Sequence, residues 1–437
     1  MRFLKCFSIC FSLLVTTIGG IFFVQCSTPS GNPSSYSQKK YHSFSIRYNT
    51  LFNIDAALRK ERERLLFQQQ NMWQIQLLEK PDYRSNSNFL DSLQQGILEL
   101  LPYVHEDRQK KALYVRLAQS YFYKEDYYAA QAYLDLPGLS FTDFEVLYYW
   151  LRIHNLLGQY QKVNSLFPEI ELGLFSPRER SLLYAAHAET FYLQRQIDSA
   201  IVYLELAQTE YAPKGYRWSW TYSLAMMYAE KENYEQALPY FQAVRRSLTA
   251  PDGIKIASEV TCLRLQSKDL NQRLAQYKQI LKKGYSLGKE GLVYMAVAED
   301  YAPHQPDSAI VYYTKAVQQY PSPRMASKAC WKLVQLYLSK SQYDLAKTYL
   351  EKIRESGYHD GLEDEARILS ANGDEWISLL RQYKEDRTIG GGVAYADFLE
   401  KIGLRKEAVG VLKELMQQDT VRKTDYLHRI NLLENML

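Results

Sequence analysis

Small apolar positions recur along most of the chain at intervals of about 36 residues. The segment that begins at Asp198 returns almost unchanged at Asp307, 109 residues later, which is three such intervals. Alignment on the small residue of this motif gives separations of 33, 37, 37, 72, 37 and 62 residues. The aligned positions are Ala130, Val163, Ala200, Ala237, Ala309, Ala346 and Ala408. We predict that each of the two long separations contains one degenerate repeat.

A second small or apolar position precedes most of these by twelve residues. These positions are Ala118, Leu151, Ala188, Ala225, Val334 and Ala396. Two small positions at this spacing predict a pair of helices that approach each other closely, while a bulky residue four positions after the first series packs against the next pair. The bulky positions are Leu134, Phe167, Leu204, Phe241, Tyr313, Leu350 and Leu412.

The pattern resembles the tetratricopeptide repeat, whose period is about 34 residues. Aromatic residues three positions after the first small residue match that repeat, and Gly158 and Gly403 fit the turn between paired helices. The matching aromatics are Tyr121, Phe191, Tyr228 and Tyr337. The expected fold class is therefore all-α, a right-handed α-solenoid of tetratricopeptide-like helix pairs.

We expect four parts along the chain. Residues 1–25 form a signal peptide, 26–40 a flexible tether, 41–105 a set of N-terminal helices, and 106–437 the repeat array with its C-terminal capping helix. Helices over Asn53–Leu78 and Ser87–Leu101 are predicted to cap one end of the array, and Thr424–Leu437 the other. Asn53 is expected to be the N-cap of the first of these helices.

Composition supports a folded helical chain and excludes some functions. The 437 residues include 37 tyrosines but only 20 glycines and 14 prolines, which predicts helices with ring-lined surfaces. A mean hydropathy of -0.38 argues against both a disordered chain and a polytopic membrane protein. The net charge of +4 gives no reason to expect nucleic acid or an acidic substrate.

The amino terminus has the features of an export signal. Arg2 and Lys5 precede an apolar stretch over Phe7–Val24, and Cys26 is followed by a polar run rich in Ser and Pro. This resembles a bacterial lipoprotein signal and predicts lipidation of Cys26, although Gln25 departs from the usual small residue. An uncleaved anchor would also place the following residues outside the inner membrane. We expect an outer-membrane lipoprotein on the periplasmic face.

No constellation predicts catalysis, and we expect no catalytic residue, cofactor or metal. Gly284–Gly288 matches the G-x-S-x-G pattern, but the expected surroundings are helical and lack the strand that a nucleophile elbow requires. Gly390–Gly392 predicts a hinge or kink, and the acidic residues 363–365 predict a solvated loop or a helix start. The seven histidines are scattered, and Cys262 and Cys330 are expected to be buried free thiols. The chain is therefore predicted not to be an enzyme.

The remaining candidate is a groove that binds an extended or helical segment of a protein partner through rings and amides. In a tetratricopeptide array the first helix of each pair lines this groove. Many of the same rings could instead only fill the superhelix. The expected groove residues are Gln119, Phe122, Tyr123, Glu189, Tyr192, Tyr222, Met226, Trp331 and Gln335.

A further motif lies between the tether and the first helix. Its elements are Tyr41-His42, Tyr48-Asn49 and Phe52-Asn53, followed by Ala57-Leu58. It resembles the signature of the gliding-motility and type IX secretion lipoproteins of Bacteroidetes, which also continue into tetratricopeptide repeats. On residue chemistry alone, Tyr41, Tyr48 and Phe52 could equally pack the first helix against the first repeat.

That resemblance implies a scaffold that links the translocon to the ring and motor components of the secretion machine. Its partners would be proteins of the cell envelope and, through the lipid on Cys26, the membrane, with no nucleic acid and no small-molecule substrate. Two other roles stay open: an adaptor in outer-membrane protein assembly and a glycan-binding uptake lipoprotein.

Overall fold

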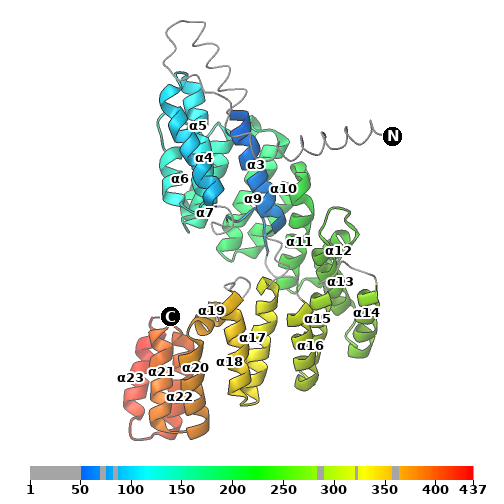
Figure 1. Cartoon of the computed structure of the whole chain (residues 1–437), viewed down its shortest axis with the longest axis vertical. Helices are drawn as coiled ribbons and strands as arrows, with labels where there is room; N and C mark the ends of the chain where they lie inside the picture. Colours follow the sequence, from blue (N-terminus) through cyan, green and yellow to red (C-terminus); the bar gives the residue numbers. More distant parts are fainter. Residues whose placement is uncertain are drawn as a thin grey trace, which may run out of the picture. The chain divides into compact units, whose positions relative to one another are not determined.

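The computed structural model describes residues 51–68, 75–81, 87–282, 290–319, 323–356 and 364–436. Within these ranges every regular element is helical, from α3 (Leu51–Gln68) to α23 (Lys423–Glu434), and there is no β-strand (Figure 1). The prediction of an all-α fold of stacked, tetratricopeptide-like helix pairs is confirmed. Among the same residues, no helix combines the length and the apolar character needed to cross a membrane.

The chain divides into two compact units. Of the described residues, unit 1 contains 51–68 and 78–211, and unit 2 contains 75–77 and 212–436. In unit 1, α5 packs beside α6 and α9 beside α10, as Figure 1 shows. The further helices of unit 1 are α4 (Ser87–Leu100), α5 (Asp107–Tyr123), α6 (Tyr127–Leu134), α7 (Phe144–Leu156), α8 (Tyr160–Leu166), α9 (Pro177–Leu193) and α10 (Ile197–Tyr211).

Unit 2 continues with the same kind of pairs. Its helices are α11 (Lys214–Glu230), α12 (Tyr234–Arg246), α13 (Asp252–Gln266), α14 (Leu270–Lys282), α15 (Glu290–Tyr301), α16 (Pro306–Gln319), α17 (Pro323–Ser339), α18 (Tyr343–Ser356), α19 (Asp364–Ala371), α20 (Gly373–Arg381), α21 (Ile389–Lys401), α22 (Arg405–Gln418) and α23. Helices α13 and α14 occupy the 72-residue separation, and α19 and α20 occupy the 62-residue separation. The two predicted degenerate repeats are therefore present.

The small positions of the repeat are fully buried in the paired helices. Ala188 on α9 and Ala200 on α10 are both 0% exposed, and the pair at Ala225 and Ala237 on α11 and α12 is the same. Without a side chain beyond Cβ at these points, the backbones of the two helices can approach closely, which is what the spacing predicted.

The turn between paired helices repeats one backbone geometry. Five positions before six of the seven aligned small residues, the chain has a positive φ, at Gly158 (70°) and Gly403 (86°) as predicted and also at four residues other than glycine. Those four are Glu125, Arg195, Glu232 and Ser341. In each turn the next amide donates to a carbonyl five residues earlier, for example from Gln159 to His154. This hydrogen bond satisfies a carbonyl in the last turn of the first helix that has no partner within the helix.

Aromatic rings, nearly all of them tyrosines, stack between the two helices of five pairs. In four of these pairs, the aromatic residue three positions after the small residue of the first helix stacks on the aromatic residue three positions after the small residue of the second helix. Tyr121 faces Tyr133 with ring centroids 5.5 Å apart, and Tyr228 faces Tyr240 with centroids 5.7 Å apart. Interplanar angles of 15° and 16° make these stacked contacts. Phe191–Tyr203 and Tyr337–Tyr349 have the same arrangement, and Tyr301 stacks on Tyr312 at a sequence separation one residue shorter.

The amino-terminal helix differs from the prediction. Helix α3 begins at Leu51, which places Asn53 inside the helix and not at its N-cap, and it ends at Gln68, ten residues before the predicted end. Residues 75–81 have no helical structure. Phe52 is 64% exposed, so it does not pack α3 against the first pair.

Replacement of glycine by alanine should have opposite effects on stability at two positions, one in a turn and one inside a helix. At Gly158 a Cβ would meet no atom within 4 Å, so Gly158→Ala should cost only the left-handed backbone, about 1 kcal/mol of unfolding free energy. At Gly96, inside α4 and equally open, Gly96→Ala should stabilise the chain by up to about 1 kcal/mol. Urea unfolding midpoints of the two variants check this, and a shift in the same direction for both would contradict it.

Candidate protein-binding site

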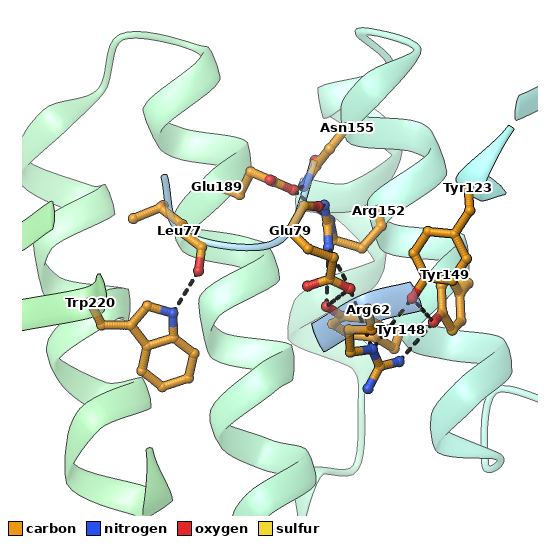
Figure 2. Close-up of polar contacts among 10 residues, drawn as sticks. All are labelled: Arg62, Leu77, Glu79, Tyr123, Tyr148, Tyr149, Arg152, Asn155, Glu189 and Trp220. Carbon is orange, nitrogen blue, oxygen red and sulfur yellow. Dashed lines mark hydrogen bonds and ion pairs between the residues drawn. The ribbon is translucent and has the colours of Figure 1, made fainter. Parts of the chain in front are cut away.

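A polar cluster with many hydrogen bonds and ion pairs surrounds Glu79 in unit 1. This residue belongs to a non-helical stretch over residues 78–81 and is 0% exposed. Its carboxylate Oε1 lies 3.5 Å from the hydroxyl of Tyr148, 3.6 Å from Nη1 of Arg152 and 3.5 Å from Nε of Arg62. Its backbone carbonyl also accepts from Nη2 of Arg152 (Figure 2). Side chains of α7 and α3 thus hold both the main chain and the acidic group of this stretch.

Arg152 is the centre of the cluster and is also 0% exposed. On its other side, Nε lies 2.9 Å from Oε2 of Glu189, a residue of α9. The guanidinium carbon stands 5.3 Å from the ring centroid of Phe122, a cation–π contact. A fully buried guanidinium is tolerated here because two carboxylates, a carbonyl and an aromatic face surround it.

Further bonds fix the position of Glu189. Asn155 Nδ2 donates to Glu189 Oε2 at 3.3 Å, and the hydroxyl of Thr190 donates to Asn155 Oδ1 at 2.8 Å. Burial raises the pKa of the Glu189 carboxyl, while the charge of Arg152 opposes that rise. The acidic side of the cluster is therefore held in place from two helices, α7 and α9.

Phenol groups complete the cluster towards α5. The hydroxyls of Tyr123 and Tyr149 lie 2.9 Å apart, and Arg62 Nη2 donates to the hydroxyl of Tyr149 at 2.7 Å (Figure 2). Burial raises the pKa of Tyr123, Tyr148 and Tyr149 above the ordinary value. These phenols stay neutral near pH 7 and act as hydrogen-bonding groups, not as bases.

In unit 2, side chains of α11 hold the backbone of residues 76 and 77 in a similar way. The indole nitrogen of Trp220 donates to the carbonyl of Leu77 at 2.6 Å, as Figure 2 shows. The hydroxyls of Ser219 and Ser223 donate to the carbonyl of Gln76 at 3.0 and 3.1 Å. Side chains of a helix in this fold therefore hold a non-helical stretch by its carbonyl groups.

The nine predicted groove residues fall into three groups. Gln119, Phe122, Tyr123, Tyr222 and Trp331 are buried, with exposed fractions of 0–7%. Glu189, Tyr192 and Met226 are half-buried, and Gln335 is exposed. For the five buried residues the prediction of free contact surface is corrected, because neighbouring side chains cover them: Phe122 and Tyr123, for example, pack edge-on against Tyr149. Phe122, Tyr123 and Glu189 do meet in one cluster around Arg152.

Sequence reasoning missed the residues that organise this cluster. Arg152 and Tyr148 lie on the predicted first helix of a pair, one turn apart, but nothing in the pattern distinguishes a buried arginine from an exposed one. Glu79 and Arg62 lie 73 and 90 positions before Arg152 in a part of the chain without repeats. The only available signal was an arginine in an otherwise apolar stretch, Val146–Ile153.

The other candidates form no site in the described part of the chain. Gly284–Gly288 and the side chains of 363–365 lie outside it, as do Cys26, Tyr41, His42, Tyr48 and Asn49. Gly391 and Gly392 lie in the first turn of α21, whose N-cap Thr388 accepts from the amide of Gly391. No group of His, Cys, Asp and Glu suited to a metal occurs among the described residues. Cys262 and Cys330 are free and buried, as predicted, and burial raises the pKa of each thiol to about 11.

Two histidines are buried against aromatic rings. His187 stacks on Phe167 with centroids 3.9 Å apart, and its Nε2 lies 3.2 Å from Oδ1 of Asn164. His154 stacks on Trp150 and its Nδ1 lies 2.8 Å from the carbonyl of that residue. Burial lowers the pKa of His187 to about 4 and also lowers that of His154. Both serve as neutral core residues.

Comparison with protein-family models finds no match, and comparison with curated proteins finds none either. The solved structures that resemble this one include the apo form of the quorum sensor NprR from B. thuringiensis, with 12% identity, a TM-score of 0.45, and coverage of 88% of this chain and 100% of that chain. The apo form of RapI has 11% identity, a TM-score of 0.42 and coverage of 88% and 98%. The tetratricopeptide domain of P58(IPK) has 15% identity, a TM-score of 0.23 and coverage of 80% and 86%.

Removal of Arg152 should strongly destabilise unit 1. In Arg152→Met the carboxylate of Glu79 stays buried with one of its two positive neighbours removed, and Glu189 loses its guanidinium partner; removal of one partner of a buried pair costs about 3–5 kcal/mol. The matched control is Arg178→Met, at an exposed position on α9, with an expected change within about 0.5 kcal/mol. Chemical unfolding of both variants measures the difference, and equal stabilities would contradict a buried ion-pair network.

Acid should destabilise the chain through His187. Its folded-state pKa lies below the ordinary value, so the unfolded chain binds a proton that the folded chain resists, and stability is lost as pH falls from about 6.5 to 4. The loss from this group is at most about 3 kcal/mol. His187→Gln should reduce the slope of stability against pH. Part of the slope that remains is due to His154, whose pKa is also lowered. His105→Gln, at an exposed position, should leave the slope unchanged. Urea unfolding at several pH values decides between these outcomes.

Proposed function

We propose that this protein is a non-enzymatic scaffold of the cell envelope that binds other proteins. The observation that supports this is chemical: within unit 1, Arg152 donates to the carbonyl of the non-helical residue Glu79, and within unit 2, Trp220, Ser219 and Ser223 donate to the carbonyls of residues 76 and 77. These are the groups that any extended polypeptide offers, so the same fold suits partner recognition. No nucleic acid or small-molecule substrate belongs to this proposal.

The envelope location rests on the amino terminus, which lies outside the described residues. The basic start, the apolar stretch over Phe7–Val24 and the tether after Cys26 favour a lipid anchor at Cys26. The protein would then be an outer-membrane lipoprotein whose repeat array faces the periplasm.

The proposed machine is a type IX secretion or gliding apparatus. Support for it comes from the short signature at Tyr41-His42, Tyr48-Asn49 and Phe52-Asn53. Phe52 and Asn53 lie in the first turn of α3, and the 64% exposure of Phe52 leaves its ring available to a partner. In this role the array would link the translocon to the ring and motor components.

Crosslinking in the native host tests the proposal. With a tag at the carboxyl terminus, crosslinked and solubilised envelopes should yield ring or translocon subunits by mass spectrometry. Recovery of barrel-assembly proteins or of polysaccharide-uptake components would contradict the secretion role and leave a lipoprotein of another machine. Recovery of no envelope protein at all would contradict the scaffold.

The matched control concerns the anchor. Cys26→Ala should release the protein from the membrane fraction and reduce partner recovery, whereas Ser27→Ala at the next position should leave both unchanged. A Cys26→Ala protein that stays in the membrane fraction would contradict lipidation of this residue.

A further inference from the structure

We propose that the cluster around Arg152 is a docking site for an extended, acidic segment of a protein partner, and that residues 78–81 of the chain itself occupy it as an internal substitute. The proposal rests on the scaffold function above and narrows its partner class. It concerns unit 1 alone, where α3, α5, α7 and α9 supply the side chains around Glu79.

The way in which residues 78–81 are held is that of a bound peptide. The stretch is not helical, its carbonyl at Glu79 is bonded to Arg152, and the carboxylate of Glu79 faces Arg62, Tyr148 and Arg152. Leu78 and Pro81 are buried beside it, while Lys80 is exposed. One carbonyl, one acid and flanking apolar contacts define a short recognition pattern that a partner could present.

Stability alone does not account for a charge at this position. Removing a carboxylate and a guanidinium from water costs several kcal/mol per ion, and apolar side chains of similar volume are often at least as stable. Glu79 and Arg152 are nevertheless both 0% exposed. The charge gives the position a chemical preference, because only an acidic occupant satisfies Arg152 and Arg62 together.

Exchange of the occupant would leave no buried charge unpaired. When Glu79 is replaced by the acid of a partner segment, Arg152 retains Glu189 at 2.9 Å and gains the new carboxylate. The internal stretch has the advantage of connection to the same chain, which corresponds to an effective concentration on the order of millimolar. A free peptide should therefore bind the unmodified protein weakly and bind much better once the internal occupant is weakened.

Glu79→Gln is the variant that weakens the internal occupant, residues 78–81. The amide keeps the size of the side chain and an oxygen acceptor, and Glu189 still pairs Arg152, so the fold should survive where Arg152→Met is severely destabilised. The probe is a labelled synthetic peptide with the sequence of residues 75–81, and a second peptide carries Gln in place of its single Glu. We expect Glu79→Gln to bind the acidic peptide at least about tenfold more tightly than the unmodified protein by fluorescence anisotropy, because the lost bonds are charge-assisted.

The matched control is Glu63→Gln, the same change at an exposed position of α3, which should bind like the unmodified protein. A photoreactive group on the peptide should crosslink to α7 (Phe144–Leu156). Equal binding of the acidic peptide by Glu79→Gln and the unmodified protein would overturn the proposal. Equal binding of the two peptides by the variant would overturn it too, since no carboxylate would then be recognised.

A second measurement uses the unmodified protein and does not depend on how the variant folds. With the acidic peptide at millimolar concentration, amide hydrogen exchange at residues 78–80 should accelerate, because the internal stretch leaves its place. Unchanged exchange there would mean that the stretch is a permanent part of unit 1 and that no partner enters. Failure of either test leaves the host crosslinking result intact, because that experiment detects partners on any surface.

Discussion

Close approach of two helices at a pair of small residues is the constraint on which the rest of this structure depends. Ala188 and Ala200 are fully buried, as are Ala225 and Ala237, and a larger side chain at any of them would push the paired backbones apart. The approach requires a short turn, which the chain makes with one residue of positive φ. It also sets the distance at which Tyr228 and Tyr240 stack. Because one pair cannot bury both of its faces, each depends on its neighbours.

The helix pairs could be predicted from the sequence, but the residues that cover their inner faces could not. Ala200 and its equivalents recur at a fixed spacing, so even the degenerate pairs α13/α14 and α19/α20 could be placed by arithmetic. Periodicity identifies which face of a helix points inward. It does not show which inward rings neighbouring side chains will cover, as Tyr149 covers Phe122 and Tyr123, and it contains no information about a distant stretch of chain, so that the role of Glu79 was not foreseen. The stacked partners, such as Tyr133, could have been found, because they stand at a constant offset from the aligned alanine.

Burial of Arg152 with two carboxylates gives unit 1 an inner face unlike that of an ordinary apolar core. Hydrophobic packing is tolerant of shape, whereas a guanidinium bonded to a carbonyl and placed between Glu79 and Glu189 accepts few alternatives. The tyrosine hydroxyls extend this selectivity, since each must find a partner when it is buried. A face of this kind distinguishes between occupants by charge and by backbone geometry, which is the requirement for a specific scaffold.

The stacked rings also give the protein an optical property. Each pair, such as Phe191–Tyr203 or Tyr337–Tyr349, holds its aromatic chromophores in a fixed asymmetric arrangement between two helices. Near-ultraviolet circular dichroism therefore reports the docking of helices within a pair, whereas the far-ultraviolet signal reports helix content. Since the ring pairs are distributed over both units, fraying at one end of the array would remove a fraction of the near-ultraviolet signal and leave the rest, so that partial unfolding becomes visible without any added label.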